Sequence, residues 1–266
     1  MVTTIPVIES SLITPKVRLI SMDQPWEWLG AGWKDLWRVP SASIVYGLLF
    51  VIMGYLMVYL VEGQFQYALA MTTGFLLAGP FLAMGLYDIS RRLEAGESAT
   101  LGHALTAWRH NALPIFLFGV VIGLLMIIWA RLSAALFGVI VGGRDLSLDS
   151  SAAQIFFSGS GLTFLLVFTV VGAIIAAAVF AISVVSIPMM LDRKTDFITA
   201  ILTSLTAVRA NPAPMALWAV LIVIFTGIGL MTFYLGLAIA LPLIGHATWH
   251  AYRSLVEDSD LEQQPL

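Results

Sequence analysis

Residues 210–252 read ANPAPMALWAVLIVIFTGIGLMTFYLGLAIALPLIGHATWHAY and contain no Lys, Arg, Asp or Glu. Charges are confined to short islands in the rest of the chain as well. A helix needs about 20 apolar residues to cross a bilayer core of about 30 Å. The pattern therefore predicts an all-α, polytopic membrane protein. Four further stretches are free of charge and long enough to cross, namely residues 39–61, 63–87, 110–130 and 150–191.

The composition supports the same class of protein. Hydrophobic residues make up 59% of the 266 residues and charged residues 11%, whereas a soluble domain carries roughly 25% charged residues. The net charge is −3 and the basic residues are spread among the islands, which excludes the basic patch of a nucleic-acid binder. The chain has no cysteine, so disulfides, thiolate metal sites and a thiol nucleophile are excluded.

Interruptions within the two longest stretches set the number of spans. Residues 210–252 predict two helices joined by a tight turn near Thr232. Gly159-Ser160-Gly161 interrupts the stretch 150–191, so we expect an interfacial or re-entrant segment at 150–161 and one long, tilted helix after it. We therefore expect six transmembrane helices, paired as three hairpins, at about residues 41–61, 65–87, 112–131, 162–189, 214–231 and 233–252.

The basic residues predict the orientation, because cytoplasmic loops are rich in Lys and Arg. With both termini in the cytoplasm, only Arg131 and Arg144 of the 13 basic residues lie on the opposite side. Glu62 is then expected at the outer boundary and Asp88 at the inner one, where water is available. The expected organisation is a cytoplasmic tail at 1–25, the transmembrane domain at 26–253 and an acidic cytoplasmic tail at 254–266.

A short amphipathic segment precedes each odd-numbered span. In the first of them, Trp26, Leu29, Trp33 and Leu36 recur at helical spacing, and Glu27, Lys34, Asp35 and Arg38 are expected on the opposite, polar face. We expect these segments to lie on the cytoplasmic membrane surface, and a surface helix plus a hairpin to form a threefold internal repeat. The segments are WLGAGWKDLWRVPSAS (28–43), ATLGHALTAWRHNALP (99–114) and ITAILTSLTAVRANPAP (198–214).

Ser41, Asn111 and Asn211 stand where they can cap the span that follows each surface segment. Small residues four apart predict close helix packing, although Gly and Ala are common in membrane helices in any case. The candidate packing residues are Gly119 with Gly123 and Gly236 with Ala240.

The spans contain no Asp, Glu, Lys or Arg at mid-membrane, which disfavours coupling to ions through a carboxylate relay. His246 and His250 are four residues apart and share a helix face, which suits a metal ion or haem. No third ligand is evident, and the alternative is that both histidines bond to headgroups or backbone carbonyls. No motif of a complete catalytic site is present, so we expect no enzyme activity and no cofactor.

Basic residues at the cytoplasmic ends of the spans form a candidate collar that contacts anionic lipid headgroups or a partner protein. The alternative is that they serve topology alone. The residues concerned are Arg38, Arg91, Arg92, Arg109, Arg193, Lys194 and Arg209.

Three stretches resemble a bacterial family of integral membrane proteins of unknown function, some of whose members are labelled as cytochrome c oxidase subunit I. They are AGWKDLWRVPSASIVYGLLF (31–50), PMMLDRKTDFITAILTSLTAVRANPAPMALWA (188–219) and LPLIGHATWHAYR (241–253). The resemblance covers about residues 26–256 and implies a protein of the bacterial inner membrane. The catalytic oxidase subunit needs more spans and more histidine ligands than this chain has, so the label is compatible only with an accessory or assembly subunit.

The sequence thus predicts a non-enzymatic accessory, scaffold or assembly subunit in contact with membrane lipids and other integral membrane proteins. A first alternative is a transporter or channel for an uncharged or lipidic substrate, suggested by the repeated hairpin and by Pro80, Pro188 and Pro242 within helices. A second alternative is a haem or metal protein that uses His246 and His250.

Overall fold

The computed structural model describes residues 15–60, 65–141 and 158–257. Within these residues the secondary structure is helical, and the β interactions are limited to one isolated bridge between Val17 and Val256. The elements are α1 (Gln24–Arg38), α2 (Pro40–Leu60), α3 (Phe65–Leu77), α4 (Gly79–Leu82), α5 (Met84–Glu94), α6 (Leu101–Thr106), the 3-10 helix η1 (Ala107–Asn111), α7 (Ala112–Ile140), α9 (Gly159–Ser183), α10 (Ser186–Asp192), α11 (Phe197–Ala210), α12 (Pro212–Met231) and α13 (Leu237–Leu255).

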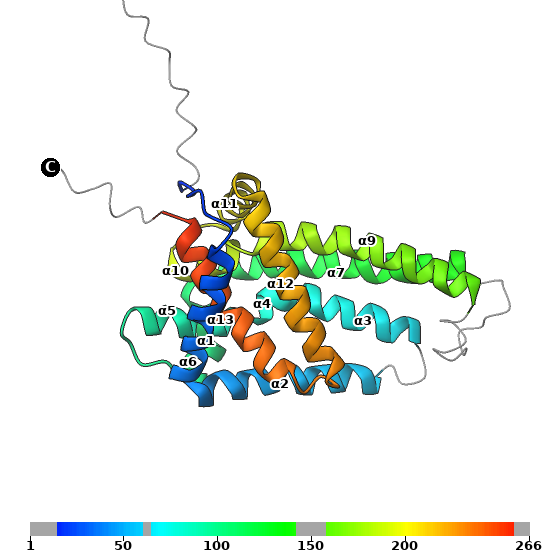
Figure 1. Ribbon diagram of the computed structural model, residues 1–266, viewed down its shortest axis with the longest axis horizontal. Helices are drawn as coiled ribbons and strands as arrows, with labels where there is room; N and C mark the ends of the chain where they lie inside the picture. The colour runs from blue at the N-terminus through cyan, green and yellow to red at the C-terminus, as the bar shows by residue number, and fades with distance from the viewer. Residues whose placement is uncertain (1–14, 61–64, 142–157, 258–266) are drawn as a thin grey trace, which may run out of the picture.

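The helices divide into a bundle and a cap. The bundle consists of α2, α3, α7 and α9, which run along the long axis, and α12, which crosses them (Figure 1). The cap consists of α1, α5, α6, η1, α10 and α11 together with the second half of α13, and it lies at one end of the bundle (Figure 1). The polar side chains described below lie in the cap.

Four helical segments of the described chain are long and apolar enough to cross a membrane: Pro40–Leu60, Leu101–Ile140, Gly159–Asp192 and Pro212–Met231. An all-α protein with several spans is confirmed, whereas the count of six is not. The expected span 65–87 is divided into α3, α4 and α5, with Pro80 in the first turn of α4, because proline cannot continue a preceding helix. The expected span 233–252 corresponds to α13, whose second half reads HATWHAYRSL and is polar.

Several boundaries differ from the sequence prediction. The helix expected at 112–131 continues to Ile140, so Arg131 lies within α7 and not in a loop. The helix expected at 162–189 is α9 followed by α10, with a turn at residues 184–185. Glu62, Arg144, residues 150–157 and most of both tails lie outside the described residues.

The turn near Thr232 is confirmed, because α12 ends at Met231 and α13 begins at Leu237. Phe233 and Tyr234 have φ angles of 53° and 66°, in the left-handed region that non-glycine residues rarely adopt. The reversal is therefore sharp enough to place α12 and α13 against each other.

A helical segment precedes each of α2, α7 and α12, as expected, but the capping predictions were wrong. Ser41 lies inside α2, which begins at Pro40. Asn111 and Asn211 occupy N-cap positions without capping. The Asn211 side chain instead accepts a hydrogen bond from Ile20 N and donates to Arg18 O, and Asn111 Nδ2 donates to the carbonyl oxygens of Met190 and Thr195. These two residues connect segments that are distant in sequence.

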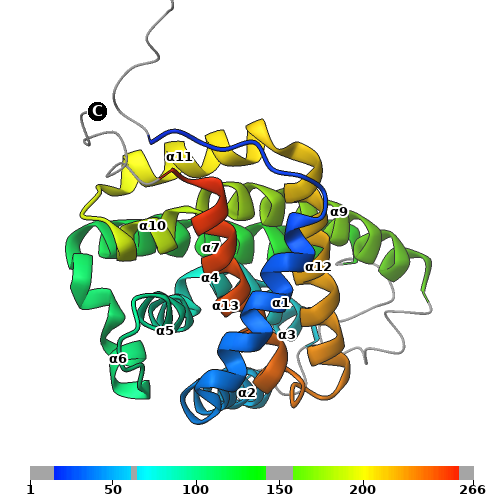
Figure 2. The ribbon, with the colours of Figure 1, turned by 60° about the vertical axis from the view of Figure 1, so that its left-hand side comes forward.

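Helix α13 is the central element of the cap, in contact with α1, α2, α5, α10 and α12. Figure 2 shows α1, α13 and α12 side by side. Glycines permit this close approach: a Cβ atom on Gly32 of α1 would lie 2.6 Å from Ala247 N, and one on Gly245 of α13 would lie 2.6 Å from Leu86 Cδ1. Side chains at these positions would separate the helices.

We expect Gly32→Ala to destabilise the protein by about 1–3 kcal/mol, because the added methyl group meets the α13 backbone and overpacks the contact. Gly30→Ala on the same helix is the matched control. A Cβ atom there meets no described atom within 4 Å, so this change should stabilise α1 by about 0.5–1 kcal/mol. Thermal unfolding of both variants in one detergent measures the difference, and equal shifts would contradict the packing of α1 on α13.

Candidate functional site

Five polar side chains from four helices form a polar cluster in the cap. They are Asp35 of α1, Ser43 of α2, Ser90 of α5, and His246 and His250 of α13. Ser43 Oγ lies 2.9 Å from His246 Nε2, and Ser90 Oγ lies 2.8 Å from His246 Nδ1. Asp35 Oδ2 accepts from Ser90 Oγ at 2.8 Å and lies 2.7 Å from His250 Nε2.

Hydrogen-bonding capacity assigns the protons in the polar cluster. Ser90 has one hydroxyl proton, which it donates to Asp35, so Ser90 accepts from His246 Nδ1–H. The other ring nitrogen of His246, Nε2, is then an acceptor for the Ser43 hydroxyl, and His250 Nε2–H donates to Asp35. This assignment follows from the network and leaves the bonded polar atoms of the cluster satisfied.

Burial makes these bonds necessary. Asp35 is 4% exposed, and Ser43, Ser90 and His246 are fully buried. Burial by itself raises the pKa of Asp35, but the hydrogen bonds from His250 and Ser90, with the nearby histidine charges, outweigh it, so the pKa lies below its ordinary value of 3.8. Asp35 is therefore an ionised carboxylate. Arg38, whose side chain is exposed, forms a longer ion pair with Asp35, with 3.7 Å between Nη1 and Oδ1.

Asp35 was expected on the polar face of α1, and that expectation was wrong. It is buried beside Trp28, Leu29 and Leu36. The exposed face carries Trp26, Trp33 and Trp37. The faces were misassigned because α1 has aromatic residues on both sides, so hydrophobicity alone does not identify the buried one. Ser43 and Ser90 gave no sequence signal, because single serines are common in membrane helices.

His246 and His250 share a helix face, as predicted, but they bind different partners. Both ring nitrogens of His246 are within hydrogen-bonding distance of serine hydroxyls, so a metal ion would have to displace one of them. Within the described part of the chain, no group of three or more His, Cys, Asp or Glu side chains is arranged to hold a metal ion. Ser43 beside His246 has the composition of a nucleophile and its base, yet Ser43 is fully buried and a substrate cannot reach it.

Asp88 is also fully buried, although the sequence placed it at a boundary with access to water. Two arginines of the candidate collar neutralise it: Arg91 Nη2 lies 2.7 Å from one carboxylate oxygen and Arg92 Nε lies 2.9 Å from the other. Arg92 also reaches Glu97 at 3.2 Å. These arginines hold the structure of α5 together.

A polar cleft of about 310 Å³ lies between α5, α10 and α13. Its side chains are paired: Trp249 Nε1 donates to Glu94 at 2.7 Å, and Arg253 Nε donates to the same carboxylate at 3.0 Å. Arg193, another member of the candidate collar, donates to the Tyr252 hydroxyl at 3.0 Å. The lining residues are Arg91, Glu94, Ala95, Asp192, Trp249 and Arg253.

The structure therefore divides the candidate collar. Arg91, Arg92 and Arg193 serve internal contacts. Arg38, Arg109, Lys194 and Arg209 are exposed on the cap, where headgroups or a partner can reach them. Arg109 lies over the ring of Trp108, 5.4 Å from its centroid.

The candidate packing residues contact different neighbours. A Cβ atom on Gly119 would lie 3.1 Å from the Phe81 ring. One on Gly236 would meet Thr232 Oγ1 of the α12–α13 turn and would lie 3.0 Å from the Gly229 Cα atom of α12. Ala240 is buried at 8% exposure. A Cβ atom on Gly123 would meet no described atom within 4 Å, so its helix face is open.

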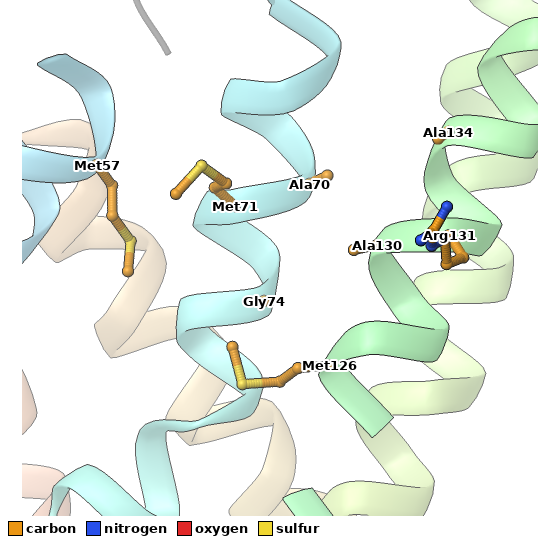
Figure 3. A pocket seen from close by; sticks show the side chains of 8 residues that line it. All are labelled: Met57, Ala70, Met71, Gly74, Met126, Ala130, Arg131 and Ala134. Carbon is orange, nitrogen blue, oxygen red and sulfur yellow. The ribbon is translucent and has the colours of Figure 1, made fainter. Parts of the chain in front are cut away.

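An apolar pocket of about 410 Å³ lies between α2, α3 and α7. Figure 3 shows Met126 and Ala130 of α7 facing Ala70 and Gly74 of α3, with Met57 of α2 on the far side of Met71. The pocket lies in the bundle and is separate from the polar cluster. Its lining residues are Met57, Ala70, Met71, Gly74, Met126, Ala130, Arg131 and Ala134.

Residues 68–192 match the DUF2189 family, which is described as a predicted integral membrane protein. This match agrees with the expected resemblance to an uncharacterised membrane family, and it covers slightly less than half of the chain. All residues that line the apolar pocket except Met57 lie within it. No curated protein and no solved structure matches the chain. With the four apolar helices, the family match identifies an integral membrane protein.

We expect Ser90→Ala to lower the free energy of unfolding by about 1–3 kcal/mol, because it removes a partner from the buried Asp35 carboxylate and from His246 Nδ1. Ser98→Ala is the matched control, since Ser98 is exposed, and it should change stability by less than about 0.5 kcal/mol. Chemical unfolding in detergent gives both values. A Ser90→Ala protein as stable as the control would contradict the hydrogen-bond network.

The lowered pKa of Asp35 predicts a defined dependence of stability on pH. The folded-state pKa lies below the unfolded value of 3.8, so the ionised group contributes full stability above a pH of about 4 and loses it as the pH falls further. We therefore expect wild type to exceed Asp35→Asn in stability at neutral pH and the difference to shrink below a pH of about 4. Unfolding of both proteins across this range tests it, and a difference that persists at lower pH would refute it.

Proposed function

We propose that this protein is a non-enzymatic accessory, scaffold or assembly subunit of a bacterial inner-membrane complex, such as a respiratory oxidase. The observation that carries the proposal is how the cap uses its polar residues. The polar cluster holds α1, α2, α5 and α13 together, and its Asp35, Ser43, Ser90 and His246 side chains are buried. The Asp88 ion pairs stabilise α5 from within. Such groups stabilise a rigid shape, which is what a subunit that positions its neighbours requires.

The exposed face of α1 is the contact surface that we propose for a partner. Trp26, Trp33 and Trp37 are 56%, 46% and 52% exposed, and the rings of Trp33 and Trp37 meet edge to face at 5.6 Å. We name this surface the Trp face. Tryptophan is enriched at protein interfaces and at the membrane boundary, so a helix at the end of the bundle with three exposed rings suits contact with another membrane protein.

We further infer that the chain crosses the membrane six times, with both termini in the cytoplasm. The course of the chain supports this topology. Helices α3 to α5 run from the far end of α2 back to the cap, and α13 runs from the far end of α12 back to the cap (Figure 1). Packing against the longer helices would shield the break at Pro80 and the polar half of α13 from lipid. Three such hairpins, each after a cap helix, agree with an internal repeat.

Purification from native membranes in mild detergent tests the accessory role. We expect partner subunits in fixed ratio with the wild-type protein, measured by quantitative mass spectrometry. Replacing Trp26, Trp33 and Trp37 together by serine should reduce their recovery at least about threefold, because buried tryptophans dominate interfaces. Trp108→Ser, which changes an exposed tryptophan elsewhere on the cap, should leave recovery unchanged. A protein that is monodisperse and alone in every preparation would refute the role.

The apolar pocket favours a second candidate function, the transport or binding of a lipidic substrate. The pocket lies between three helices of the bundle, where a lipidic substrate would enter from the membrane. A lipid transfer assay between vesicles, with the reconstituted protein, separates this candidate from an accessory role. Absence of transfer above that of protein-free vesicles would eliminate transport.

A further inference from the structure

The apolar pocket has the size and the lining of a site for an acyl chain. Its volume of about 410 Å³ falls within the range of about 300–1,000 Å³ of small-molecule sites. Small residues on both helices leave the space, since Ala70 and Gly74 of α3 face Ala130 and Ala134 of α7. Three methionines complete the lining, and their flexible thioether side chains adapt to an irregular apolar chain.

The pocket is open on the α7 side, because Ala130, Arg131 and Ala134 are exposed. Beside them, Ile127 and Ile128 are 60% and 57% exposed. This surface belongs to an apolar spanning helix and therefore faces the acyl chains of the bilayer. Phospholipid is the amphiphile that reaches such an opening.

Among the described residues that line the pocket, Arg131 is the only charged one. It makes no hydrogen bond or ion pair with any residue that the structure describes. Arg131 stands 19 residues after the start of α7, so its Cα atom lies about 28 Å along the helix at 1.5 Å per residue. If α7 enters the bilayer at its first turn, this is the edge of a hydrocarbon core about 30 Å thick.

At this depth the guanidinium can extend to the headgroup layer, where phosphates and water are its partners. The phosphates of the lipids begin at the same level. The planar set of N–H donors on the Arg131 guanidinium matches the oxygens of a phosphate. Thus a cation without a partner in the described chain lies on α7 beside the apolar pocket (Figure 3), and a phospholipid likewise carries its phosphate next to its acyl chains.

We propose that the apolar pocket binds one acyl chain of an anionic phospholipid, whose phosphate is held by Arg131. The site gives the second candidate function its ligand class. It is independent of the accessory role, because the pocket and the Trp face lie on different helices.

The test uses the full-length protein, equilibrated in detergent with equal amounts of phosphatidylglycerol and phosphatidylcholine that carry identical acyl chains. Native mass spectrometry then counts the lipids retained on the protein. We expect wild type to retain phosphatidylglycerol over phosphatidylcholine by roughly threefold to tenfold. The choline cation of phosphatidylcholine offsets its phosphate charge, whereas phosphatidylglycerol presents a net negative charge to Arg131. Arg131→Gln should abolish the preference, and Lys34→Gln, which removes an exposed cation of α1 outside the candidate collar, should preserve it.

Gly74→Leu should lower the retention of both lipids, because a Cβ atom there already lies 3.7 Å from Met126 Cε and a longer side chain fills the pocket. Ala134→Leu at the open side gives the same result if the buried variant does not fold. Equal retention of the two lipids by wild type, or a preference that survives Arg131→Gln, would overturn the proposal. Recovery of partner subunits with Arg131→Gln should stay unchanged. The lipid measurement can therefore reject the lipid site without rejecting the accessory role, and the recovery of partners can reject the accessory role without rejecting the lipid site.

Discussion

An ionised carboxylate almost without contact with water is the constraint on which the cap depends. Asp35 is 4% exposed, and the cost of burying its charge is offset only by donors in fixed positions. Those donors come from α5 and α13, and His246 extends the network to Ser43 on α2. A shift of any one of these helices would leave a buried polar group without a partner. The polar cluster therefore fixes the relative positions of four helices more strictly than apolar packing alone would.

Helix α13 is the element through which this constraint acts on the whole molecule. It contacts α1, α2, α5, α10 and α12, and glycines at Gly32 and Gly245 bring the neighbouring helices close to it. A helix enclosed in this way can carry histidines and an arginine, because protein and not lipid surrounds it. The bundle, in contrast, exposes apolar residues, and Arg131, the one charge among the described residues that line its pocket, lies on an exposed part of α7. The interactions that fix helix positions are thus concentrated in the cap, whereas the bundle presents the exposed apolar surface.

The sequence predicted the parts of the fold that follow from local patterns. Helical segments before α2, α7 and α12 and the turn near Thr232 were expected from periodicity and breaks in charge-free stretches, and both are present. Predictions that depended on which side chains contact each other were wrong. Asp35 and Asp88 were both expected in water, and both are buried against partners 55 or three residues away. His246 and His250 were found as a pair, but Ser43 and Ser90, which bond His246, were not.

The sequence by itself determined that this is a helical membrane protein, because charge-free stretches of 21 residues or more are stable in a bilayer whatever their neighbours. Only the tertiary structure decided which polar residues are buried together and where Arg131 lies. Those outcomes depend on contacts between residues far apart in the chain, such as Ser43 with His246 at a separation of 203 residues. The boundary of α7 was decided in the same way. Charge marks Arg131 as the end of a span, whereas the helix continues to Ile140 and places the arginine beside an apolar pocket.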